Sequence, residues 1–347
     1  MTDFERAVRD LVADVENAYW DLQFAFRDLE AKVDARDIAL VTAKKLEAQT
    51  AVQGTGDVAQ AMEQYYRFES DVIDAVNGRS VDGTRTNNGS AGGSFRGTGG
   101  LRVAERRLRL ILGIAINDGK LIRPSDDPSH APILYDWANS SGKALAKREE
   151  IRRQRWVLKQ RELELIANRN FLKPQLDVVG RYRFRGFGKD LVNYNEKSDA
   201  LSNLLDGNYQ EWQAGLDYTL PVGFRKAFTA VRNSQLILHR EGEILKEQER
   251  VVLYGLSNAM NEMKRSYDSM QLQEKRLVEI VRQLQSLQAK WESGKDPALD
   301  VLLDTHRRLL DARLRYHQSR VEYALAIRNV EFEKGTLLEF CKINLVG

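Results

Sequence analysis

Apolar residues recur in alternating steps of four and three along much of the chain, and no other feature limits its folding as strongly. Such a heptad series lines one side of an α-helix and is typical of long helices that pack by supercoiling. The first series consists of Leu11, Val15, Ala18, Leu22, Ala25 and Leu29. The second consists of Leu253, Leu256, Met260, Met263, Tyr267 and Met270. We therefore predict a mainly α protein built from long, coiled helices.

Glycine-containing turns interrupt both long helices, which predicts two antiparallel helical hairpins. The first helix reaches about residue 52, and a second one returns over 58–76. In the second half we expect a long descending helix over 225–293, a tip turn over 294–299 and an ascending helix over 300–340. The turn residues that we single out are Gly54, Gly56, Gly294 and Lys295.

Both halves follow one scheme under a shift of 241 residues, which predicts an internal duplication. The shift aligns heptad positions and brings the two tip glycines within one residue of each other. We assign residues 1–143 to the first repeat and 144–347 to the second. The first repeat contains an insertion rich in Gly, Ser and Asn over 77–100 and then a proline-containing connector, and a third helix follows over about 135–170. The aligned positions are Val15, Leu22 and Leu29 with Leu256, Met263 and Met270.

The clear strand signal lies in the second repeat, where a β-hairpin is expected over 175–220. Two segments of about ten residues alternate apolar and polar side chains, as strands of a membrane barrel do. Aromatic residues gather here, as they do at membrane interfaces. A soluble hairpin packed on a helix would alternate equally well, so both interpretations stay open. The residues that we assign to a membrane hairpin are Tyr182, Phe184, Trp212, Leu216, Tyr218 and Pro221.

Composition argues against several other functions. The net charge is only +3, from 53 basic and 50 acidic residues, whereas nucleic-acid binders concentrate positive charge. One cysteine and 4 scattered histidines offer no metal cluster, and no phosphate-binding or nucleophile motif is present. We therefore predict no nucleic-acid partner, no cofactor, no metal and no enzyme activity. No apolar stretch is long enough for a transmembrane helix, and no signal peptide is visible.

Several segments, in the same order along the chain, resemble the TolC-like outer membrane efflux family. GKDPALDVLLD at 294–304 and RRLLDAR at 307–313 resemble the periplasmic tip turn and the returning helix of that family. LKPQL at 172–176 resembles the entry into a strand, and LPVGFRKA at 220–227 resembles the exit from the barrel. RRLRLILG at 106–113 resembles the end of an ascending helix.

The resemblance implies a passive export duct of a tripartite efflux or type I secretion system in a Gram-negative-type bacterium. It implies a homotrimer whose hairpins join a trimeric transmembrane β-barrel in the cell outer membrane, within the outer membrane lipid, while most of the chain is periplasmic. A periplasmic adaptor (membrane fusion protein) would dock at the tip turns, and an inner-membrane pump would drive transport. The other function that we keep is a periplasmic coiled-coil adaptor or scaffold without a membrane barrel.

The family closes its periplasmic entrance with aspartates that follow the tip glycine. Asp300 stands at the matching position, and Asp304 lies one residue beyond the second acidic position. An acid in the first turn also favours the helix dipole, so capping and gating are both expected roles for Asp300. Compared with the family pattern, a signal sequence, a first helix and a first β-hairpin are missing, and we expect an N-terminally truncated chain.

Overall fold

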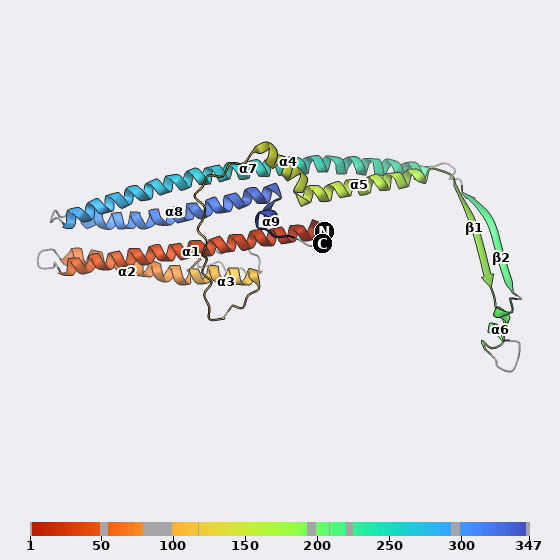
Figure 1. Cartoon of the computed structure of the whole chain (residues 1–347), viewed down its shortest axis with the longest axis horizontal. Coiled ribbons are helices and arrows are strands. Elements are labelled where there is room, and N and C mark those ends of the chain that lie inside the picture. Colours follow the sequence, from red (N-terminus) through yellow and green to blue (C-terminus); the bar gives the residue numbers. More distant parts are fainter. Residues whose placement is uncertain are drawn as a thin grey trace. The chain divides into compact units, whose positions relative to one another are not determined.

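The computed structural model describes residues 2–48, 55–78, 99–116, 118–192, 199–207, 209–219, 225–292 and 299–344. These residues are mainly α-helical and include one antiparallel β-hairpin, which confirms the predicted fold class (Figure 1). They form two compact units, the first from Met1–Arg153 with Gln248–Gly347 and the second from Gln154–Glu247. None of the described helices combines the length and the apolar character that a membrane span requires.

The first helical hairpin lies within the first unit. Helix α1 (Thr2–Ala48) packs against α2 (Thr55–Asn77) and α3 (Leu101–Leu112), as Figure 1 shows. Small side chains recur at every fourth position of α1, so that the neighbouring helices approach its backbone closely. The seam leucine Leu11 is an exception to the predicted burial, because half of its surface stays exposed. The buried alanines of this stripe are Ala31, Ala35, Ala39 and Ala43.

Helices α2 and α3 meet where the insertion leaves and rejoins the helical part of the chain. Gly78 has a φ of +81°, and a Cβ atom there would lie 2.9 Å from the Gly100 nitrogen. A Cβ atom on Gly100 would in turn lie 2.1 Å from the Gly78 nitrogen. Only glycine permits this approach, so the two glycines bring the ends of the insertion together.

The second helical hairpin pairs the C-terminal part of α7 (Arg225–Glu292) with α8 (Leu299–Lys334). Leu284 of α7 belongs to one cluster with Leu302 and Leu309 of α8, and all three side chains are buried. Helix α8 also packs against α1, where Leu310 joins the cluster of alanine side chains. The predicted heptad seam of α7 is confirmed, since Leu256, Met263 and Met270 are buried.

The predicted single helix over 135–170 is wrong. The structure divides it into α4 (Trp137–Lys147) and α5 (Glu149–Asn170), with Arg148 in an extended conformation between them. The Arg148 guanidinium donates to the Phe332 carbonyl oxygen (3.2 Å) and pairs with Glu333 (3.0 Å). A tertiary contact with α8 therefore breaks the helix where the sequence has neither glycine nor proline.

The end of α8 also differs from the sequence expectation. Helix α8 ends at Lys334 rather than at residue 340, because Gly335 follows with a φ of +71°. A short helix, α9 (Leu337–Phe340), comes after it. The Gly335 Cα lies so close to Arg148 that an added Cβ would be 3.1 Å from the Arg148 nitrogen. The α4–α5 break and the end of α8 thus form one junction.

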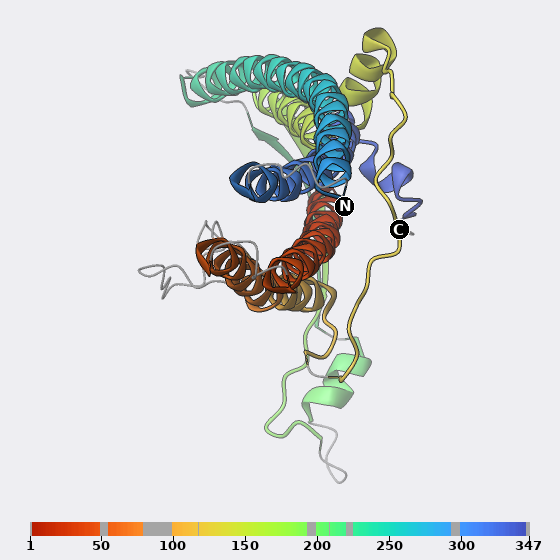
Figure 2. The same cartoon turned by 90° about the vertical axis from the view of Figure 1, so that its left-hand side faces the viewer.

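An extended connector from α3 to α4 spans both helical hairpins of the first unit (Figure 2). On α1, the Tyr19 hydroxyl donates to the Asp126 carboxylate (2.8 Å). On α8, Arg320 donates to the Pro128 carbonyl oxygen (2.9 Å), and the buried Tyr323 hydroxyl donates to Ala131 (2.8 Å). The connector therefore joins α1 to α8 through side chains that come from both helices.

The second unit contains the β-hairpin. Strand β1 (Gln175–Phe184) pairs antiparallel with β2 (Gln210–Thr219), and helix α6 (Ala200–Leu205) lies in the connection. Every residue of both strands is exposed, on both faces of the hairpin. Within the described part of the chain, no helix packs on either face, unlike the soluble hairpin that the alternation alone would also allow.

Candidate functional site

The first turns of α8 carry both predicted gate residues on their exposed side. The Asp300 carboxylate accepts a hydrogen bond from the Gln60 amide of α2 (2.6 Å), so it connects the two helical hairpins. Asp304 pairs with Arg308 of its own helix (2.7 Å). Asp300 therefore contacts another helix, whereas the partner of Asp304 among the described residues lies on its own helix. Asp300 also lies in the first turn of α8, where capping is compatible with this connection.

A second polar contact between the hairpins lies beside the first. Gln64 is completely buried, and its amide donates to the Leu303 carbonyl oxygen (3.2 Å). Sequence reasoning missed Gln60 and Gln64. Their four-residue spacing puts both amides on one side of α2, which is the signal that could have found them.

Of the predicted turn residues, the structure describes only Gly56, in the first turn of α2 with open space around its Cα. Gly54, Gly294 and Lys295 lie outside the described residues, as does Pro221 of the hairpin set.

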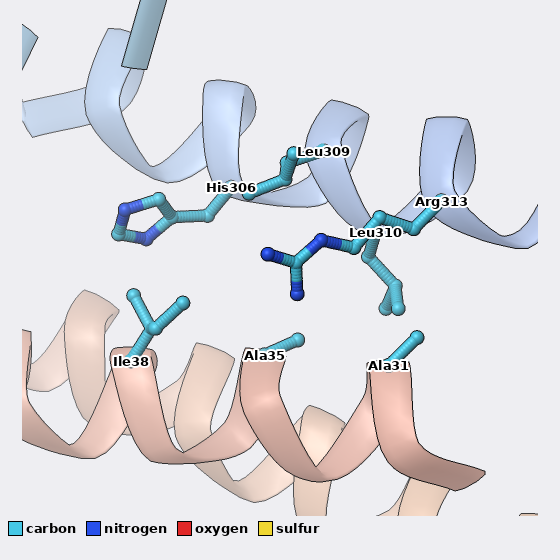
Figure 3. Close-up of a pocket in the computed structure, with 7 residues that line it drawn as sticks. All are labelled: Ala31, Ala35, Ile38, His306, Leu309, Leu310 and Arg313. Atoms are coloured by element: carbon cyan, nitrogen blue, oxygen red, sulfur yellow. The ribbon is translucent and has the colours of Figure 1, made fainter. Parts of the chain in front are cut away.

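His306 is the most unusual polar side chain of this region. Figure 3 shows its ring reaching from α8 towards Ile38 of α1, in a small cavity of about 10 Å³. The side chain is 4 % exposed, and neither ring nitrogen has a hydrogen-bond partner among the described residues. Burial lowers the pKa of His306 to about 4, so the ring stays neutral at physiological pH. The cavity is lined by Ala31, Ala35, Ile38, His306, Leu309, Leu310 and Arg313.

Near the same end, Trp291 of α7 packs against the buried Ala43 and Leu46 of α1. The Lys45 ammonium lies 5.7 Å from the centre of the indole ring. An open groove of about 700 Å³ runs beside them, and Asp37, Lys45, Gln288 and Trp291 are among the residues that line it.

The register of the β-hairpin places all five described residues of the predicted membrane set on one face. Leu176 pairs with Tyr218, Val178 with Leu216, and Tyr182 with Trp212, while Phe184 follows on the same side. The Tyr182 and Phe184 rings contact edge to face, with centres 4.8 Å apart. The opposite face carries mostly charged and polar side chains: Asp177, Arg181, Arg183, Glu211, Gln213 and Asp217.

No cluster of three or more metal-ligating side chains occurs in the part of the chain that the structure describes. Cys341 donates a hydrogen bond to Glu16 (3.0 Å), and burial raises the pKa of its thiol to about 12. A thiol with so high a pKa is almost fully protonated at neutral pH and is a poor nucleophile.

Residues 141–332, which include the hairpin and the aspartates of α8, match the family model for outer membrane efflux proteins. The chain belongs to the outer membrane efflux protein family. This family consists of outer membrane efflux channels rather than enzymes. The assignment favours the export channel over the adaptor or scaffold that the helical hairpins alone would also allow.

Solved structures show the same fold as this efflux protein, although no curated protein sequence matches it. The outer-membrane channel OprN aligns with a TM-score of 0.72 at 15% identity, over 96% of this chain and 68% of that one. For VceC from Vibrio cholerae the TM-score is 0.70 at 13% identity, over 96% of this chain and 72% of that one. For the CmeC channel of Campylobacter jejuni it is 0.67 at 16% identity, over 97% and 64%.

Proposed function

We propose that this efflux protein is a subunit of a passive export channel in a tripartite efflux or type I secretion system. Three copies would form a homotrimer, in which each hairpin joins a shared β-barrel in the outer membrane of a Gram-negative-type bacterium. The helices would form a periplasmic conduit. A periplasmic adaptor would dock at the helix tips, beside the groove at Trp291, and an inner-membrane pump would drive transport.

The β-hairpin is the observation that carries this proposal. Both of its ten-residue strands are exposed on both faces, and one face is apolar. An isolated two-stranded hairpin is marginally stable in water, and its outer edges leave backbone groups unpaired. Neighbouring hairpins in a closed barrel would pair those edges, while lipid would cover the apolar face. The proposed assembly thus satisfies both requirements.

Labelling of two adjacent cysteines tests the membrane position. Leu216 and Asp217 point to opposite faces of β2, so Leu216→Cys and Asp217→Cys differ only in their side. In a Cys341→Ser background reconstituted in liposomes, a lipid-soluble thiol reagent should label position 216 and an impermeant one position 217. Equal labelling of both positions by the water-soluble reagent would refute the barrel, as would a stable monomer in solution without detergent.

We further propose that the contact between Gln60 and Asp300 holds the helix tips in their closed arrangement. This hydrogen bond joins α2 to α8, and Gln64 adds a second contact to the Leu303 carbonyl oxygen. Separation of the two helical hairpins would have to break both. Asp304 serves as a matched control, because its partner Arg308 lies on the same helix.

Single-channel recordings in planar bilayers test this gate. Gln60→Ala and Asp300→Ala should each raise the open probability of the pore, whereas Asp304→Ala should leave it near that of the unaltered protein. If Asp304→Ala opened the channel as much as Asp300→Ala, the contact between the hairpins would not be the restraint.

A further inference from the structure

The polar face of the β-hairpin separates its charges along the strands. Towards the loop, Arg181 and Arg183 follow each other on this face, and the alternation continues to Arg185. At the other end, where the strands leave the helices, Asp177 stands directly opposite Asp217. One face of one hairpin thus has a basic end and an acidic end.

The basic end is only partly neutralised within the strands. The Glu211 carboxylate pairs with Arg185 (2.7 Å) and lies 3.7 Å from Arg183. The partner of Arg181 in the register is Gln213, which carries no charge. Three guanidinium groups therefore share one strand carboxylate, which leaves two positive charges in excess.

The acidic end is not explained by hairpin stability. Directly opposed like charges destabilise a strand pair. Asp177 accepts a hydrogen bond from the Gln175 amide (2.9 Å), which is a neutral donor two residues away. Because neither end gains stability from its excess charge, the charge separation calls for another reason.

We propose that these two charge clusters line the export passage, and that Arg181 and Arg183 make its outer part selective for anionic solutes. The inference rests on the proposed function, in which the apolar face meets lipid and the polar face therefore points inward. Rings of arginine or lysine favour anions in pores, and rings of aspartate favour cations. Threefold assembly would turn each cluster into such a ring.

The position of each ring follows from the connections of the hairpin. The acidic end adjoins the helices and would face the periplasmic conduit, whereas the basic end adjoins the loop and would lie at the outer mouth. A cation entering from the conduit would then meet a repulsive ring on its way out. The ring of arginines at the basic end would attract an anion towards the outer mouth.

Reversal potentials of the full-length protein in planar bilayers, under a KCl gradient, test the proposal. The double variant Arg181→Gln/Arg183→Gln should lower the permeability ratio of chloride to potassium severalfold, and Arg181→Lys/Arg183→Lys should retain it. Asp177→Asn/Asp217→Asn should raise the ratio. Lys189→Gln is the matched control, because it removes an exposed positive charge of the same loop end without touching the strands.

The possible outcomes separate this inference from the proposed function. If the unaltered protein formed no pore, both would fail. If every variant formed pores of normal conductance and trimer content, but the arginine-to-glutamine pair changed the ratio no more than Lys189→Gln, the anion selectivity alone would be overturned. Loss of selectivity in the lysine pair would also overturn it, since that variant keeps the charge.

Discussion

Acidification should weaken the packing of α1 against α8 through His306. The ring is buried against Ile38 without a hydrogen-bond partner among the described residues, and it is neutral there. Protonation would create a charge that no carboxylate lining the small cavity balances, because the charged residue that lines it, Arg313, is also positive. The groove that His306 also borders carries one acidic and one basic lining residue, Asp37 and Lys45. Opening of the interface, which returns the ring to water, therefore becomes more favourable as the pH falls.

The magnitude follows from the pKa of His306, which burial lowers from 6.5 to about 4. Between these values the open chain binds more protons than the packed one, so the free energy of opening rises with pH across this window. Below the lower pKa, the free energy of opening is reduced by its full amount, roughly 3 kcal/mol. At pH 5 the loss relative to pH 7.5 is about 2 kcal/mol.

Hydrogen exchange of the α8 segment that contains His306 measures this effect, once intrinsic exchange rates are corrected for pH. His306→Leu replaces the titrating group with an apolar side chain of similar size. The difference in opening free energy between this variant and the unaltered protein should grow by about 2 kcal/mol from pH 7.5 to pH 5, or roughly 30-fold in protection. The comparison cancels other groups, including His317, whose pKa burial also lowers to about 4.

His239 lies on an exposed part of α7 and serves as the control. His239→Leu should show no growing difference over the same pH range. The argument would be refuted if the difference in opening free energy between His306→Leu and the unaltered protein stayed constant with pH. Burial of the His306 ring would then not be coupled to proton binding.

Three further predictions concern the junctions of the first unit. Arg9→Met should lower the free energy of unfolding by roughly 3 kcal/mol in a denaturant titration, because it removes the guanidinium that lies 2.7 Å from the buried Glu149 carboxylate. The control Lys45→Met removes an exposed positive charge and should lower this free energy less. Tyr323→Phe should cost about 1–3 kcal/mol and speed proteolysis of the connector, since its hydroxyl donates to Ala131 and accepts from Ile133; unchanged cleavage would contradict this. Gly335→Ala should cost about 1–2 kcal/mol of thermal stability because of its positive φ, and a variant as stable as the parent would show that the junction can relax.

Heptad spacing and strand alternation were sufficient to predict the helical hairpins and the β-hairpin, because both patterns are local. Burial of Leu256, Met263 and Met270 follows from a repeat that any long amphipathic helix would show. The alternation of β1 likewise places Tyr182 and Phe184 on one face whatever surrounds the hairpin. The tip turn that the sequence indicates before residue 300 also predicted that Asp300 would lie in the first turn of an ascending helix, as it does in α8.

Contacts between segments that are distant in the sequence could be identified only from the tertiary structure. Arg148 breaks a helix because it reaches Phe332 and Glu333, and no residue near it in the sequence indicates a break. Gln60 becomes a partner of Asp300 only when α2 lies beside α8. By sequence, His306 is only one of four scattered histidines, and its lowered pKa arises from burial against α1. Local pattern therefore determines which segments are helix or strand, whereas the partner of each polar side chain depends on how the helices pack, because the two residues are far apart in the chain.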